Sequence, residues 1–239
     1  MKNKCLLIAI LLLAHLMTNA QTISMPYEFP IKPGTEEWKK FQSRSEMADV
    51  LQIPSAILKN LTTESLAKTC LNFPMFKDLY FFNDVQTGFN TLKQSFNGFQ
   101  ELLNRSDASI ELVKLYKQMN PKSFNSTWND TLKGSFTFQF VQIEMLLAQD
   151  QIINTLLAET KSALLKEAAQ KYELKKASNQ FSGFALSPSI LIIGRILDKE
   201  NKLQSLKAGA TKGSIQKFLS TGTADNSEIL EQILLLSKN

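Results

Sequence analysis

The apolar side chains of this chain recur at intervals of three and four residues, and this spacing constrains the fold more than any other feature. Val85, Phe89, Leu92 and Phe96 follow one another at steps of four, three and four, which places them on one face of an α-helix. Similar segments follow along most of the chain, separated by proline, glycine or asparagine. Helical pieces joined by short turns, without a strong strand pattern, predict an all-α fold.

Proline and polar residues divide the chain into five parts. We expect a signal peptide over residues 1–20, an extended proline-rich strap over 21–34, an array of short paired helices over 35–120, a loop over 121–134, and longer helices over 135–239. Dense proline favours extended backbone over helix in the strap. The paired short helices predict a solenoid-like stack or an irregular bundle, and we expect both helical parts to pack as one domain.

The segment Val141–Lys176 contains neither proline nor glycine, and its spacing predicts one long helix. Phe136, Phe138 and Phe140 alternate as a strand would, but we interpret them as the entry to this helix.

Short polar residues mark where three other helices begin. The predicted N-caps are Thr62 or Thr63, Asn83, and Asp225 or Asn226.

The N-terminus has the three-part layout of a secretory signal peptide. Lys2 and Lys4 supply the positive charge, Cys5–Met17 is almost wholly apolar, and Thr18–Ala20 provides short residues before Gln21. The apolar run is shorter than the ~20 residues that a membrane span needs, so an uncleaved anchor helix is the less favoured alternative. We expect an exported chain, periplasmic or extracellular, with no transmembrane segment after cleavage.

Cleavage of the signal also removes most of the residues on which common catalytic sites depend. His15 is the only histidine, and Cys5 is one of two cysteines. Without an imidazole the mature chain cannot form a Ser-His-Asp or Cys-His nucleophile, and catalytic zinc sites usually need histidine. Cys70 remains as a lone thiol, which we interpret as a small core residue. We therefore expect no metal and no cofactor.

The charge of the chain gives little reason to expect nucleic-acid binding. The formal net charge is +5, and it falls to +3 when Lys2 and Lys4 leave with the signal. No long block of like charge follows, so we expect no nucleic-acid partner.

Two charged residues lie within strongly apolar segments. Glu144 occurs in Phe140–Leu147 and Arg195 in Leu191–Leu197. A buried charge is costly unless it is paired, so we expect Glu144 and Arg195 to form a structural buried pair between two core helices, or to share a polar network. The alternatives are that Glu144 is a catalytic acid, or that either residue lies on a narrow solvated stripe.

Several stretches resemble a group of exported bacterial proteins that carry no assigned activity. The matching stretches are Pro33–Trp38, Gln52–Pro54, Leu58–Pro74 and Asn97–Arg105, with a weaker match at Gly194–Leu197. The resemblance covers most of the mature chain. It implies an all-helical secreted protein, and it brings no catalytic residue.

These observations favour a non-catalytic binding or interaction module at the cell envelope, whose partner is another protein or an envelope component. One alternative is a carboxylate-dependent hydrolase acting on glycans, which needs two acids across a polar cleft and for which Glu144 is the candidate. The other is a carrier of an apolar ligand, suggested by the 16 phenylalanines, which needs an enclosed apolar pocket.

The signal peptide can be tested by its removal. When the full-length chain is expressed in a bacterium, the exported product should lack residues 1–20 and begin at or near Gln21, because signal peptidase cleaves after short residues. N-terminal sequencing and the intact mass of the periplasmic and medium fractions measure this. A membrane-bound product that retains residues 1–20 would contradict the prediction and identify an anchor helix.

Overall fold

A computed structural model describes residues 22–207 and 212–238 of the chain. Within these residues the regular structure is helical and no strand is formed, which confirms the prediction of an all-α fold. The more detailed expectation of a solenoid-like stack or an irregular bundle stays a prediction. The predicted signal peptide lies outside the described residues.

The helices have the following bounds. They are η1 (Trp38–Lys40), α2 (Arg44–Val50), α3 (Ser55–Leu58), α4 (Thr63–Leu71), η2 (Phe76–Phe81), α5 (Val85–Ser95), α6 (Asn97–Asn104), α7 (Ala108–Gln118), η3 (Pro121–Ser123), α8 (Asp130–Leu147), α9 (Asp150–Thr155), α10 (Ala158–Lys176), α11 (Gly183–Lys199), α12 (Gln204–Lys207), α13 (Lys212–Thr221) and α14 (Ser227–Leu236), where η marks a 3₁₀-helix.

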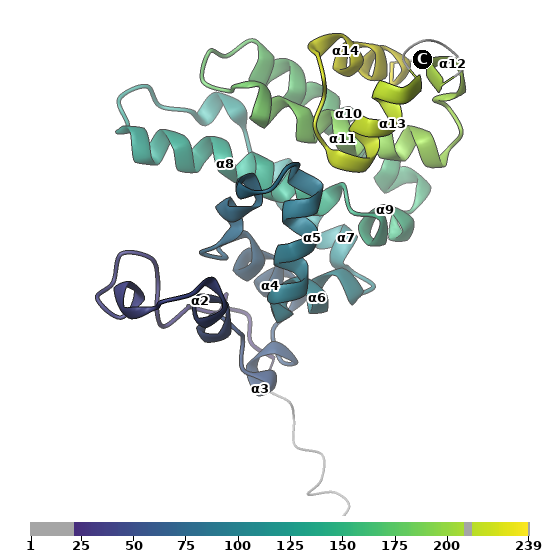
Figure 1. Cartoon of the computed structure of the whole chain (residues 1–239). Helices are drawn as coiled ribbons and strands as arrows, with labels where there is room; N and C mark the ends of the chain where they lie inside the picture. Colours follow the sequence, from purple (N-terminus) through teal and green to yellow (C-terminus); the bar gives the residue numbers. More distant parts are fainter. Residues whose placement is uncertain (1–21, 208–211, 239) are drawn as a thin grey trace, which may run out of the picture.

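Helix α8 joins the two helical parts of the chain. It packs against α7 and α4 on one side and against α11 on the other. In Figure 1 the short helices α4–α7 lie below α8, and the C-terminal helices α10, α11, α13 and α14 lie above it. A single cluster of buried apolar side chains runs from Phe29 to Leu234 through both parts.

The segment that precedes the helices is tied to the body of the protein by hydrogen bonds. Ile23 pairs with Leu61 in an isolated parallel bridge. The Ile23 amide donates to the carbonyl of Asn60 at 2.7 Å, and the Tyr27 amide donates to the Thr69 hydroxyl at 2.8 Å. Extended backbone lacks internal hydrogen bonds, so these contacts to α4 and the residues before it satisfy its polar groups.

Phenylalanine forms the core of the short-helix part. The rings of Phe73 and Phe96 stack with centroids 4.2 Å apart, and Phe99 meets both edge-on. Phe29 of the strap completes this cluster. Such pairs contribute about 0.5–1.5 kcal/mol each beyond the burial of their area.

The prediction of one helix over Val141–Lys176 is wrong, because two breaks divide this segment. The backbone becomes extended at Gln149, with ψ of 142°, and again at Leu156 and Leu157, with ψ of 126° and 155°. The Gln149 side chain exchanges hydrogen bonds with that of Gln86 in α5, and Leu156 is buried. Tertiary contacts therefore end the helix where neither proline nor glycine does.

Some of the other predicted helix boundaries agree with the structure and some do not. Thr62 and Asn226 cap α4 and α14, as expected. Asp84 caps α5, so the prediction of Asn83 is wrong by one residue. Helix α8 begins at Asp130, capped by Asn129, so the predicted loop ends earlier than residue 134 and the alternating phenylalanines are helical.

Within the described ranges, no helix combines the length and apolar character that crossing a bilayer requires.

The 3₁₀-helix η2 lies directly against α5 because Gly88 leaves room for it. A Cβ atom at Gly88 would lie 2.2 Å from the Leu79 carbonyl oxygen, well inside van der Waals contact. The backbone of η2 therefore touches the backbone of α5, and this contact sets where Tyr80, Phe81 and Phe82 stand.

Substitution of Gly88→Ala should destabilise the protein by about 1–3 kcal/mol, since the methyl group must displace η2. The matched control is Gly134→Ala in α8, where an added Cβ meets no atom within 4 Å, so the change should stabilise by up to about 1 kcal/mol through helix propensity. Urea denaturation of both variants measures the free energy of unfolding. Equal stability of the two variants would contradict the close approach.

Candidate functional site

Glu144 lies at the centre of a buried polar network. Its side chain is fully buried on α8, and its Oε1 and Oε2 accept hydrogen bonds from the Lys175 ammonium at 2.9 and 2.8 Å. Oε1 also accepts from the Tyr116 hydroxyl at 2.7 Å and the Ser189 hydroxyl at 2.8 Å. The four residues come from α8, α10, α7 and α11, so one carboxylate joins four helices.

The surroundings of Lys175 satisfy its charge and all of its donors. Its third contact is the carbonyl of Ala185 at 2.5 Å, and an ammonium has three N–H donors. Burial lowers the pKa of Lys175, while the Glu144 carboxylate acts to raise it. Burial, followed by the charge of Glu144, raises the pKa of the Tyr116 hydroxyl. Glu144 is fully buried and lines neither of the cavities described below.

The expected pair of Glu144 and Arg195 does not form, because Lys175 supplies the cation for Glu144. Arg195 lies further along α11 and donates instead to two carbonyls, that of Ala148 at 2.8 Å and that of Leu219 at 2.9 and 2.8 Å. Both carbonyls belong to the C-terminal ends of helices, α8 and α13. The negative end of a helix dipole favours a cation, and the charge of Asp150 also favours the charged guanidinium, which explains how Arg195 is half-buried without an ion pair to any described residue.

Lys175 is the residue that sequence reasoning missed. It lies among charged neighbours in Lys171–Lys176, so its segment does not look apolar. The signal that could have found it is spacing, because Leu164, Ala168, Tyr172 and Lys175 follow at steps of four, four and three and all are buried. A lysine on such a stripe requires a buried acid.

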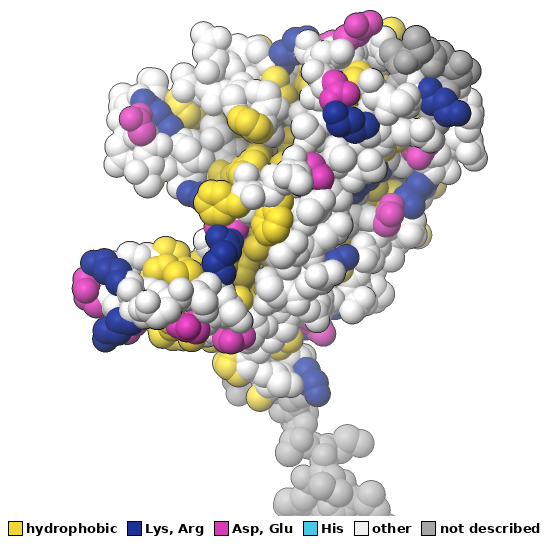
Figure 2. Space-filling view, in the orientation of Figure 1, with side chains coloured by type: hydrophobic (Ala, Val, Ile, Leu, Met, Phe, Trp, Pro, Cys, Tyr) yellow, Lys and Arg dark blue, Asp and Glu magenta, His cyan; other side chains and the backbone are white. Residues whose placement is uncertain are grey.

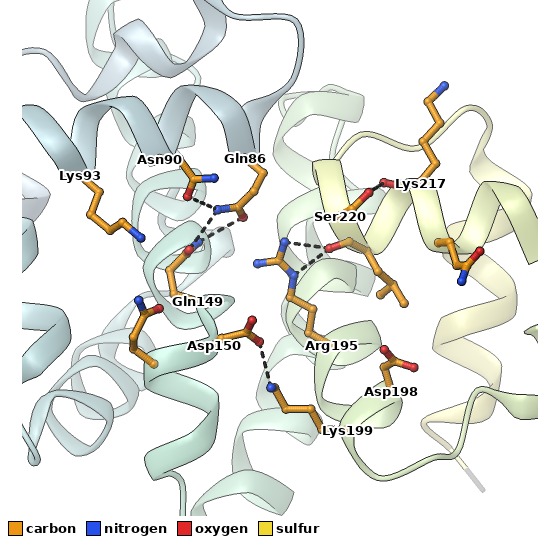
Figure 3. A pocket seen from close by; sticks show the side chains of 13 residues that line it. Gln86, Asn90, Lys93, Gln149, Asp150, Arg195, Asp198, Lys199, Lys217 and Ser220 are labelled. Carbon is orange, nitrogen blue, oxygen red and sulfur yellow. Dashed lines mark hydrogen bonds and ion pairs between the residues drawn. The ribbon is translucent and has the colours of Figure 1, made fainter.

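A polar pocket of about 850 Å³ lies between α5, α9, α11 and α13. Figure 3 shows its side chains converging from these helices. Leu219 is the only apolar residue among them, and the polar lining consists of Gln86, Asn90, Lys93, Gln149, Asp150, Gln151, Arg195, Asp198, Lys199, Gln216, Lys217 and Ser220.

Two glutamines form one wall of the polar pocket. Gln86 and Gln149 exchange hydrogen bonds of 3.1 and 3.4 Å between their amides. Gln86 also donates to the Asn90 side-chain oxygen at 3.0 Å. Both glutamines are buried, so this wall has a fixed arrangement. Beside it, Asp150 pairs with Lys199 at 3.0 Å, as Figure 3 shows.

An aromatic groove lies on another face of α11. We define it as the surface lined by Tyr80, Phe82, Phe138, Phe184, Leu186 and Pro188. It consists of two adjoining hollows of about 580 and 360 Å³, which share Tyr80, Ser182 and Phe184. Figure 2 shows hydrophobic side chains gathered in a band beside the notch of the molecule.

The rings of the aromatic groove hold one another in place. The centroid of Tyr80 lies 5.7 Å from that of Phe184 and 5.8 Å from that of Phe138. Phe184 is nevertheless 71% exposed, although a ring of this size ordinarily lies in the interior. Polar groups line one end, where Glu231 accepts from the Tyr172 hydroxyl and the Lys176 ammonium, both at 2.6 Å.

Cys70 belongs to no cluster of potential metal ligands among the described residues. Cys70 is fully buried in α4, and burial raises the pKa of its thiol well above the ordinary value, which suppresses the reactive thiolate. Among the described residues, no three or more His, Cys, Asp or Glu side chains are grouped so that they could hold a metal ion.

Comparisons of the chain with protein-family models, with curated proteins and with solved structures found no match.

Substitution of Lys175→Met should lower the free energy of unfolding by about 3–5 kcal/mol, because it leaves the buried Glu144 carboxylate without its cation. The double variant Glu144→Leu and Lys175→Met should lower the free energy of unfolding by less than the sum of the two single changes, and the difference should be about 0.5–3 kcal/mol. Chemical denaturation measures all three variants.

The adjacent residue provides the control. Lys176→Met removes an exposed ion pair with Glu231 and a cation–π contact with Tyr172, and such exposed contacts each contribute about 0–1 kcal/mol. A Lys175→Met variant no less stable than Lys176→Met would show that the buried network does not hold the helices together.

Proposed function

We propose that the protein is an exported, non-catalytic binding protein whose aromatic groove holds an apolar segment of a partner protein. The observation that carries this proposal is the aromatic groove itself, in which Phe184 is exposed and Tyr80 and Phe82 are partly exposed. An exposed, contiguous apolar surface is uncommon on a monomer and marks interaction sites.

The open form of the groove favours a polypeptide over a small apolar ligand. Carriers bury most of their ligand within an enclosed cavity. Here Phe184, at the junction of the two hollows, is 71% exposed, and the hydrophobic band is open along its length (Figure 2). A fatty chain placed there would remain half in water, whereas a partner protein covers the groove with its own surface.

Cations lie near the Phe138 end of the groove, whereas Asp84, Lys176 and Glu231 line the larger hollow. The Lys77 ammonium lies 5.8 Å from the ring centroid of Phe138, and the Arg44 guanidinium lies 5.4 Å from that of Phe81. Arg44 pairs with Asp78, but Lys77 has no hydrogen bond or ion pair with any of the described residues. Acidic residues flanking the apolar segment would complement the Phe138 end, because complementary charge favours encounter and register.

A glycan hydrolase is the less favoured alternative, although two acids, Asp150 and Asp198, line the polar pocket. Glu144, the acid with a sequence-based reason to be catalytic, is sealed from solvent by Lys175, Tyr116 and Ser189. Asp150 in the polar pocket is engaged by Lys199.

Export to the cell envelope is part of the same proposal. It is supported by the layout of residues 1–20 and by the resemblance to exported bacterial proteins. The partner would then be another protein of the periplasm or cell surface.

The proposal can be tested with synthetic 12-residue peptides labelled with a fluorophore. One peptide carries a Phe- and Leu-rich centre with Glu flanks, a second has the same centre with Lys flanks, and a third replaces the centre with Ser. Fluorescence anisotropy should show binding in the order Glu-flanked, Lys-flanked, Ser-centred. Phe184→Ala should lower the affinity for the Glu-flanked peptide by about tenfold or more, as truncation of aromatic anchors does at other interfaces.

Leu157→Ala is the matched control, because Leu157 is also 71% exposed but lies outside the aromatic groove. It should leave peptide binding unchanged. A single-chain fatty acid that binds while no peptide does would overturn the proposal in favour of a carrier. Equal effects of Phe184→Ala and Leu157→Ala on peptide affinity would show that the aromatic groove is not the peptide-binding site.

A further inference from the structure

We infer that the polar pocket is a second, separate binding site, and that it takes an acidic sugar, a ring that carries a carboxylate and several hydroxyl groups. This site shares no lining residue with the aromatic groove, so the inference does not depend on the proposed protein partner.

The charge balance of the pocket favours an anion. Four cationic side chains line it, against the two acids Asp150 and Asp198. Lys199 is engaged by Asp150, and Lys217 pairs with Asp225 outside the pocket. Lys93 and Arg195 form no ion pair among residues 22–207 and 212–238, although the charge of Asp150 acts on Arg195.

Arg195 offers a fork of two unused donors. A guanidinium has five N–H donors, and the carbonyls of Ala148 and Leu219 occupy three of them. One N–H on each terminal nitrogen therefore remains without a hydrogen-bond partner in the described part of the chain. These bonds to two helix ends also fix the direction of the guanidinium. An arginine held in this way matches the two oxygens of a carboxylate.

Lys93 adds a second cation from the opposite wall. It lies in the last turn of α5, and Figure 3 shows its ammonium directed into the space that Arg195 enters from α11. No described residue accepts a hydrogen bond from this ammonium. An anion between α5 and α11 would meet a point charge on one side and the arginine fork on the other.

The uncharged polar side chains of the pocket indicate which other chemical groups the bound anion carries. The amide donors of Gln86 and Gln149 are engaged by each other, by Asn90 and by the Met145 carbonyl. The side chains of Gln151 and Gln216 and the amide nitrogen of Asn90 have no partner within the described part of the chain. Amides both donate and accept, which suits hydroxyl groups. Because the lining residues other than Leu219 are polar, hydroxyl groups suit this surface better than an aliphatic or aromatic ring does.

The size of the pocket agrees with this class of ligand. Its volume of about 850 Å³ falls within the range of about 300–1,000 Å³ typical of small-molecule sites. A monosaccharide fits, and a terminal residue of an acidic polysaccharide could enter from the open side.

The test is isothermal titration of the mature protein with D-glucuronate, D-glucose and inorganic phosphate. Glucuronate should bind, glucose should bind at least about tenfold more weakly for lack of the carboxylate, and phosphate should be weaker than glucuronate for lack of hydroxyl contacts. Lys93→Met should lower the affinity for glucuronate by about tenfold or more, since a charge-assisted hydrogen bond is lost.

Lys117→Met is the matched control. Lys117 occupies the last turn of α7, as Lys93 does in α5, and it lies outside the polar pocket. It should not change the affinity for glucuronate. Lys93 is a half-exposed surface residue, so circular dichroism and thermal unfolding of Lys93→Met should match the parent protein.

Three outcomes would overturn the inference. They are the absence of glucuronate binding, equal affinity for glucose, and phosphate binding that equals or exceeds that of glucuronate. The result is separable from the proposed function, because Phe184→Ala should leave glucuronate binding intact and Lys93→Met should leave peptide binding intact.

Discussion

The rest of the structure depends on one buried ion pair between Glu144 and Lys175. Through Tyr116 and Ser189 it joins four helices, α7, α8, α10 and α11. Removing one member leaves an uncompensated charge in the interior, which is far more costly than losing an exposed pair. Arg195 makes a second connection, because it draws the C-terminal ends of α8 and α13 to α11.

Both candidate surfaces are built on the helices that these contacts hold. One end of α11 contributes Phe184 and Pro188 to the aromatic groove, and the other contributes Arg195 to the polar pocket. Helix α5 likewise lines both surfaces, with Val85 in the larger hollow of the groove and Lys93 in the polar pocket. Gly88 on α5 also sets the position of η2 and its aromatic residues. Rigid helices thus present two chemically different surfaces, one apolar and open, the other polar and cationic.

The fold class and several helix ends could be predicted because they depend on local chemistry. Spacing at steps of three and four identifies an apolar helix face, and the side chains of Thr62 and Asn226 accept from backbone amides three residues further on. The breaks at Gln149 and Leu156 could not be predicted in this way. They exchange helical hydrogen bonds for contacts with α5 and the core, which are distant in sequence.

The amino-acid sequence alone determined that the chain is helical, that Glu144 lies in an apolar segment where burial requires a cation, and that His15 is the one histidine of the sequence. Only the tertiary structure decided that the cation is Lys175, 31 residues away, and that Arg195 binds helix ends instead. Spacing along one helix shows which face is buried. It does not show which residue of another helix meets that face, because the partner is set by how the helices pack.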